Sequence, residues 1–180
     1  MTLTTDWKNL LIDAEIARNY HWIMGDHRLL SIPLVDSIIV SGLLIRAISL
    51  LDDALDNFIS DERIPVPDKN PRLYHRLRTL DLEKRLSDFE DIDHWRQRRN
   101  DVGHEVSETY TWDELERCLS AIFRELNHIE LLTVFHRFEV RKTIQRVPQS
   151  NHRLSQQVLL EVIEGDEIIK SFQWRVRSGS

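Results

Sequence analysis

The sequence contains little cysteine, glycine or proline: one cysteine, 5 glycines and 5 prolines in 180 residues. The single Cys118 excludes an internal disulfide and a zinc site built on a cysteine pair, and its apolar helical neighbours predict a core residue. So few glycines exclude a glycine-rich phosphate loop. The eight histidines are scattered along the chain. We therefore expect neither a metal nor another cofactor.

Long apolar runs are also missing. A helix that crosses a bilayer takes about 18 to 20 apolar residues, and the longest candidate, 31–51, is interrupted by Asp36 and Arg46. The first residues do not combine a basic segment with an apolar one, so we expect no signal peptide. Together with the single cysteine, these features predict a cytoplasmic protein with no membrane partner.

The net charge of −6 argues against a protein that coats nucleic acid by bulk attraction. The charge is uneven, however, because residues 135–180 carry 8 basic and 5 acidic groups while 1–134 carry 16 and 25. The basic side chains near the carboxyl end could guide RNA or bind an acidic partner, and the sequence does not decide between them. They include Arg141, Lys142, Arg146, Arg175 and Arg177.

Helical spacing of apolar residues dominates the first three quarters of the chain. Ser87 with Glu90 and Thr111 with Glu114 have the spacing of capping boxes, which mark helix starts. A stretch with three prolines, 60–71, is the clearest loop. The helix before it is apolar on nearly all sides, which predicts the buried centre of a bundle. We expect helices over about 5–24, 31–59 and 71–80, one that opens at Ser87, and one over about 111–133.

The last forty residues change to the alternation typical of half-buried strands. Residues 156–176 read as a hairpin that turns at "EGDE", 164–167, and 138–147 can supply a third strand. Three strands cannot bury a core alone, so this sheet should pack on the helices. The expected fold is mainly α: an antiparallel helical bundle over 1–137, with a C-terminal antiparallel hairpin or meander over 138–180 in the same structural unit.

The stretch "HWRQRRNDVGHE", 94–105, is the strongest candidate for a site. Arg96 and Asn100 share a helix face, and so do Asn100 and His104. Arg99 is offset from His104 by roughly 140°, which a long arginine can span. An imidazole, a guanidinium and an amide are the groups that metal-free cleavage of a phosphodiester requires.

The segment "RRNDVGHE" resembles the Arg-Asn-x-x-x-His motif of the HEPN superfamily, helical-bundle proteins that include ribonuclease toxins. Arginine followed directly by asparagine, with histidine at this spacing, is expected about 0.03 times per chain of this composition. The order helix, polar loop and helix beginning with tryptophan, over 87–130, is also similar to that family.

This resemblance implies a metal-independent endoribonuclease of a toxin–antitoxin or phage-defence system. By it, Arg99 and His104 are the catalytic pair, and Asn100 orients His104 or binds RNA. Arg96, which shares a helix face with Asn100, is a further candidate for binding or orienting the substrate. The resemblance further implies a homodimer, an RNA substrate and an antitoxin protein as a further partner.

Two other interpretations stay open. The chain could be a non-catalytic HEPN-like module that binds a nucleotide, RNA or protein, or a helical interaction protein in which the motif is accidental. In the second case His104 could pair with Glu105 or Glu108, and Arg99 could stack on Trp95 four residues earlier.

Overall fold

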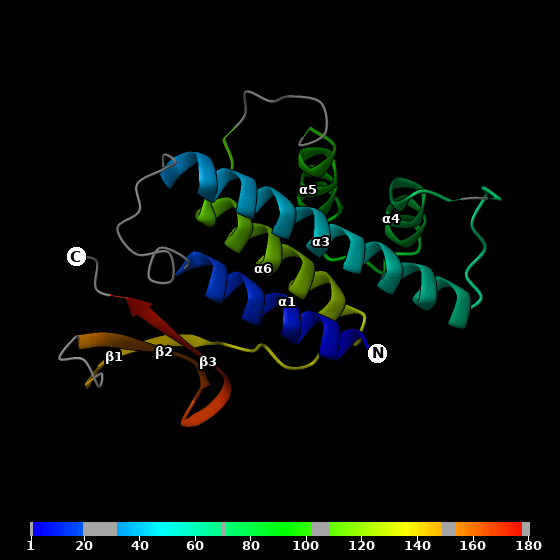
Figure 1. The fold of residues 1–180 in the computed structure, drawn as a ribbon. Coiled ribbons are helices and arrows are strands. Elements are labelled where there is room, and N and C mark those ends of the chain that lie inside the picture. The colour runs from blue at the N-terminus through cyan, green and yellow to red at the C-terminus, as the bar shows by residue number, and fades with distance from the viewer. Residues whose placement is uncertain (1, 20–31, 70, 102–108, 149–153, 178–180) are drawn as a thin grey trace. The chain divides into compact units, whose positions relative to one another are not determined.

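The computed structural model describes residues 2–19, 32–69, 71–101, 109–148 and 154–177. Within these ranges the protein is mainly helical and carries one small antiparallel sheet, which confirms the expected class (Figure 1). The helices are α1 (Leu3–Arg18), α3 (Ile32–Asp61), α4 (Leu73–Leu82), α5 (Phe89–Asp101) and α6 (Trp112–His128), and the strands are β1 (Glu139–Pro148), β2 (Leu154–Glu164) and β3 (Glu167–Arg177).

The chain divides into two compact units. One consists of Met1–Leu10 and Arg28–Phe135, and the other of Leu11–His27 and His136–Ser180. The first unit holds α3 to α6, and the second holds the sheet. The packing of the sheet on the helices in one structural unit stays a prediction.

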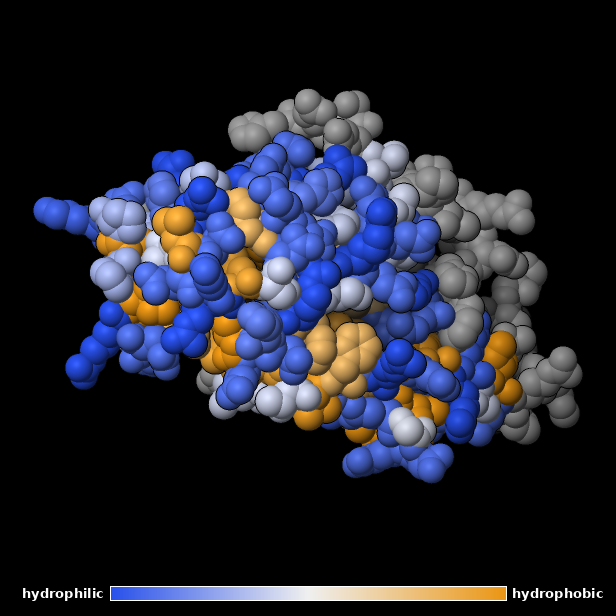
Figure 2. Space-filling view, turned by 180° about the vertical axis from the view of Figure 1, so that it is seen from behind, coloured by the Kyte–Doolittle hydropathy of each residue, from blue (hydrophilic) through white to orange (hydrophobic). Residues whose placement is uncertain are grey.

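Helix α3 organises the first unit, since it contacts α4, α5 and α6. Figure 1 shows α4 and α5 beside one another along α3. Leu44, Leu51 and Leu55 are fully buried at helical spacing, and each such side chain contributes about 1.5–3 kcal/mol when it leaves water. Ile38 and Ile45 are exposed, so α3 is not buried on every side as its composition suggested. Figure 2 likewise shows apolar side chains in patches that hydrophilic ones interrupt.

The start of α6 confirms the second predicted capping box. The Thr111 hydroxyl accepts from the backbone N–H of Glu114 at 3.3 Å, and the Glu114 carboxylate accepts from the backbone N–H of Thr111 at 2.9 Å. The helix ends at His128, five residues before the predicted end. Glu130 adopts a positive φ of 62°, and the N–H of Leu131 turns back to the carbonyl of Leu126, which closes the helix in a manner common at C-termini.

The first predicted capping box, at Ser87, is wrong. Helix α5 is capped by Asp88, whose carboxylate accepts from the backbone N–H of Asp91 at 3.1 Å. Ser87 instead donates both its backbone N–H, at 2.7 Å, and its hydroxyl, at 2.6 Å, to the carboxylate of Glu125 on α6. Glu125 has no exposed surface, so these bonds replace the water that the carboxylate loses on burial. They attach the residue before the α5 cap to α6.

The sheet has the order β1-β2-β3. The predicted hairpin turn is confirmed: Glu164 pairs with Glu167, and Gly165 between them takes a φ of +61°, which glycine adopts without steric cost. The predicted third strand is β1, which pairs along its whole length with β2. Alternate residues of β2, Val158, Leu160 and Val162, are buried and form the apolar face.

Candidate functional site

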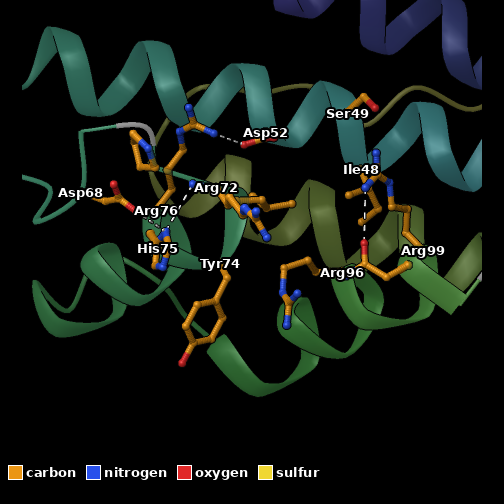
Figure 3. Close-up of a pocket in the computed structure, with 13 residues that line it drawn as sticks. Ile48, Ser49, Asp52, Asp68, Arg72, Tyr74, His75, Arg76, Arg96 and Arg99 are labelled. Carbon is orange, nitrogen blue, oxygen red and sulfur yellow. Dashed lines mark hydrogen bonds and ion pairs between the residues drawn. The ribbon is translucent and has the colours of Figure 1, made fainter.

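A cleft of about 900 Å³ lies among α3, α4 and α5, and we call it the arginine cleft. Two other hollows among the described residues have volumes of about 800 and 320 Å³. Figure 3 shows the side chains of the arginine cleft entering from all three helices and from the segment before α4. Its lining consists of Ile48, Ser49 and Asp52 from α3; Asp68, Pro71 and Arg72 from the segment; Leu73, Tyr74, His75 and Arg76 from α4; and Arg96, Arg99 and Asn100 from α5.

Three of the four predicted site residues therefore line one cleft. Arg96, Arg99 and Asn100 come from the last turns of α5 at the spacing i, i+3 and i+4, which places them on one side of the helix. Arg99 also lies seven residues after the buried Ile92, two helical turns along the same seam. The inner face of α5 thus changes from apolar to cationic where the core ends and the cleft begins.

The guanidinium of Arg99 has no carboxylate partner among the described residues. Its one hydrogen bond there runs from Nη1 to Oδ1 of Asn100, at 3.3 Å. That bond restricts the rotamer of Arg99 and leaves the other donors of the guanidinium available. The alternative that Arg99 stacks on Trp95 is not what the structure has, because Arg117 occupies that position, 6.0 Å from the ring centroid.

Arg96 is held more tightly. Its Nε donates to Asp93 at 2.5 Å, and its guanidinium lies over the ring of Tyr74, 5.2 Å from the centroid. Burial acts to raise the pKa of Asp93, but hydrogen bonds from Arg96 and Gln97 outweigh burial and hold the pKa below its ordinary value. Asp93 therefore stays ionised and fixes Arg96 at the wall of the cleft.

Arg98, the neighbour of Arg99, points elsewhere. Its Nη2 donates to Glu114 of α6 at 3.0 Å, and its guanidinium lies 4.6 Å from the ring centroid of Tyr110. Burial acts to raise the pKa of Glu114, yet hydrogen bonds from Thr111 and Arg98 lower it overall. Arg98 thus joins α5 to α6, and of the two adjacent arginines only Arg99 lines the cleft.

On the opposite wall, Arg76 of α4 forms ion pairs with both Asp52 and Asp56 of α3; the contact to Asp56 is 2.7 Å. Asp52 and Asp56 are four residues apart on one face of α3, and both bind the guanidinium of Arg76. No group of three or more His, Cys, Asp or Glu side chains among the described residues is placed to hold a metal ion.

Sequence reasoning missed the residues that α4 and its preceding segment bring to the cleft. Arg72, Tyr74 and His75 belong to "RLYHRLR", 72–78, in which basic and aromatic residues interleave. This interleaving is visible in the sequence, but the apolar spacing of the same segment predicts only a helix. His75 Nδ1 accepts from the backbone N–H of Arg72 at 3.3 Å and lies 3.4 Å from the carboxylate of Asp68 (Figure 3).

His104, the fourth predicted site residue, lies outside the described residues, as do 102–108 as a whole. Its convergence with Arg99 stays a prediction, and so does the alternative that it pairs with a nearby glutamate.

Cys118 is buried, as expected, and burial raises the pKa of its thiol to about 12, which keeps it protonated and unreactive at neutral pH.

None of the helices in the described ranges combines the length and apolar character that a bilayer crossing needs. No family model, curated protein or solved structure matches the chain. The proposals that follow therefore depend on the motif and on the chemistry of the cleft.

Proposed function

We propose that this protein is a metal-independent endoribonuclease of a toxin–antitoxin or phage-defence system, and that it binds RNA in the arginine cleft. The observation that carries the proposal is the position of Arg99. A guanidinium with no carboxylate partner among the described residues stands in a cleft, next to an amide that orients it, five residues before His104. As further parts of the proposal, the protein acts in the cytoplasm as a homodimer and is neutralised by an antitoxin protein.

The chemistry is transesterification within the RNA. The 2′-oxygen attacks the adjacent phosphorus, a bond from O2′ to phosphorus forms, and the bond from phosphorus to O5′ of the next nucleotide breaks. A base removes the proton of the 2′-hydroxyl and an acid protonates the leaving O5′. His104 performs this proton transfer, and in a dimer the second copy of the motif supplies the second imidazole. The products are a 2′,3′-cyclic phosphate and a free 5′-hydroxyl.

Arg99 stabilises the negative charge that grows on the non-bridging oxygens of the phosphorane. A fixed guanidinium suits this task because its forked donors match two phosphate oxygens and its charge does not titrate near neutral pH. Asn100 holds that fork in place through its amide oxygen. Arg96, fixed by Asp93 through its Nε, has further N–H donors that can bind the RNA backbone.

The cleft gathers four arginines although the whole chain carries −6. Two aspartates line the cleft with them, and Asp56 and Asp93 form ion pairs with Arg76 and Arg96. The formal charges of these eight side chains balance, so the cleft attracts a phosphate through the guanidiniums that have no carboxylate partner among the described residues. The acidic remainder of the surface disfavours unspecific coating.

The test is cleavage of a mixed RNA substrate in EDTA by wild type, Arg99→Ala and His104→Ala. Wild type should cleave, and each substitution should lower the rate by about 10²-fold or more, the usual cost of losing one stabilising group. Arg85→Ala is the matched control: it removes the same charge from a half-exposed side chain outside the cleft, whose nearest carboxylate, that of Glu62, is 4.0 Å away. It should retain wild-type activity.

Oligomeric state and folding are measured on the same samples by sedimentation and circular dichroism. A folded wild type that binds RNA in the cleft without cutting it would refute the enzyme and favour the non-catalytic HEPN-like module. A folded wild type that neither binds nor cuts several classes of RNA would refute both.

A further inference from the structure

The four arginines of the cleft divide into two kinds. Arg76 and Arg96 are neutralised by aspartates, Arg76 by Asp52 and Asp56, and Arg96 by Asp93. Among the described residues, the guanidiniums of Arg72 and Arg99 have no carboxylate partner. The positive charge that remains for a ligand is therefore concentrated at two points.

These two points lie on different elements. Arg72 immediately precedes α4, and Arg99 belongs to the last turn of α5. In Figure 3 the side chain of Arg72 enters from the α4 side and that of Arg99 from the α5 side, with Arg96 between them in this view. A ligand that satisfies both arginines must extend along the cleft.

The backbone of Arg72 is fixed although its side chain is exposed. Its carbonyl accepts from the N–H groups of His75, at 2.9 Å, and Arg76, at 3.2 Å, and its own N–H donates to the His75 ring. With φ of −77° and ψ of 164°, the residue is extended and caps α4. Because the backbone is already ordered, binding of an anion costs only the rotamer freedom of the Arg72 side chain.

The cleft offers an anion the charge of Arg72 and Arg99. Arg76 and Arg96 line the same cleft, but their aspartates balance them, and Asp68 lies 3.4 Å from His75. An anion is therefore attracted mainly to Arg72 and Arg99. The cleft volume of about 900 Å³ is near the top of the range of about 300–1,000 Å³ for small-molecule sites. This volume is enough for a short segment of a single strand.

We propose that Arg72 forms a second phosphate subsite, so that the cleft binds a single-stranded RNA segment by two phosphates, one at Arg99 and the other at Arg72. This inference rests on the proposed function and adds the substrate class to it. Arg72 acts on binding: it holds the strand in register and takes no part in the bond-breaking step at Arg99.

The test measures equilibrium binding of 2′-O-methyl oligouridylates that carry one, two or three phosphates. The methyl group blocks attack by the 2′-oxygen, so binding is seen without cleavage. Wild type is compared with Arg72→Ala, Arg72→Lys, Arg99→Ala and the control Arg85→Ala. Circular dichroism and thermal melting check that each variant is folded.

For the two-phosphate probe, Arg72→Ala should weaken binding about tenfold, the effect of one charge-assisted contact. The one-phosphate probe should change less than twofold, because it still has Arg99. The slope of log affinity against log salt should fall by about 0.7 for the two-phosphate probe, as expected for one lost phosphate contact on a single strand. Arg72→Lys should restore the salt slope and only part of the affinity.

The outcomes separate this inference from the function on which it rests. If Arg99→Ala weakens binding but Arg72→Ala leaves the two-phosphate probe unaffected, the second subsite is refuted and the ribonuclease proposal stands. If a stable RNA duplex, long enough to stay paired, competes as well as the single strand, the substrate class is wrong. If wild type binds none of the probes, both proposals are refuted.

Discussion

Two adjacent arginines of α5 should affect different properties of the protein when each is replaced by alanine. Arg98 donates to Glu114 at 3.0 Å and lies over the ring of Tyr110, and its side chain is only 19% exposed. Arg99 lines the cleft and bonds only to its neighbour Asn100 among the described residues. We expect Arg98→Ala to lower stability and Arg99→Ala to lower RNA cleavage.

The magnitude for Arg98 follows from its contacts. A hydrogen bond between charged groups contributes about 1.5–3 kcal/mol and a cation–π contact about 0.5–1 kcal/mol. Glu114 keeps its two bonds from the backbone N–H and hydroxyl of Thr111, so it is not left unsatisfied. Arg98→Ala should therefore cost about 2 kcal/mol of unfolding free energy, and Arg99→Ala no more than about 0.5 kcal/mol.

Urea denaturation followed by circular dichroism gives the two stabilities, and initial rates of RNA cleavage in EDTA give the two activities. Activity is measured well below the melting temperature of the weaker variant, so that unfolding does not contribute. Equal losses of stability in the two variants, or a larger loss of activity in Arg98→Ala than in Arg99→Ala, would refute the assignment of Arg99 to the cleft and of Arg98 to the contact with α6.

Three further predictions concern the support of the site. Ser87→Ala removes a 2.6 Å hydrogen bond to the buried Glu125 and should cost about 2 kcal/mol in urea denaturation; a cost under about 0.5 kcal/mol would contradict the role of this bond. Folding lowers the pKa of Asp93 below its ordinary value of 3.8, so near that pH the unfolded chain binds more protons than the folded one. The stabilisation by Asp93 is therefore present above the ordinary pKa, and it is lost as pH falls through the folded pKa. Asp93→Asn should therefore be less stable than wild type at pH 7 but lose less between pH 5 and 3, and parallel pH profiles would refute this. Cys118 should resist thiol reagents at pH 8 in the native protein and react fully in urea; rapid native labelling would show that it is not buried.

Elements governed by local chemistry could be predicted from the sequence. Thr111 and Glu114 satisfy one another within one turn, and Gly165 supplies the positive φ of a two-residue hairpin. Both signals act over a few residues, and in both cases the structure keeps the local arrangement. Ser87 shows the opposite case, because its spacing to Glu90 is that of a capping box, yet a buried carboxylate 38 residues away takes both of its donors.

The candidate site could be predicted only in part, for the same reason. The motif identified Arg96, Arg99 and Asn100, and all three line the cleft. The spacing of arginine and histidine allowed Arg98 as well as Arg99, and only the packing of α5 against α6 separates them. The contribution of Arg72 depends on how α4 crosses α5, which no local pattern in 72–78 specifies.

The attachment of Ser87 to Glu125 has a consequence for genetics. Helix α5 has 13 residues, so its ends lie about 20 Å apart, with this anchor just before the first turn and Arg99 in the last. A substitution at position 87 or 125 can therefore tilt the helix and misplace a guanidinium that neither residue touches. If the proposed toxin function holds, a screen for loss of toxicity should find such variants together with those of the cleft residues, and they should regain activity at lower temperature, whereas replacements of Arg99 should stay inactive at every temperature.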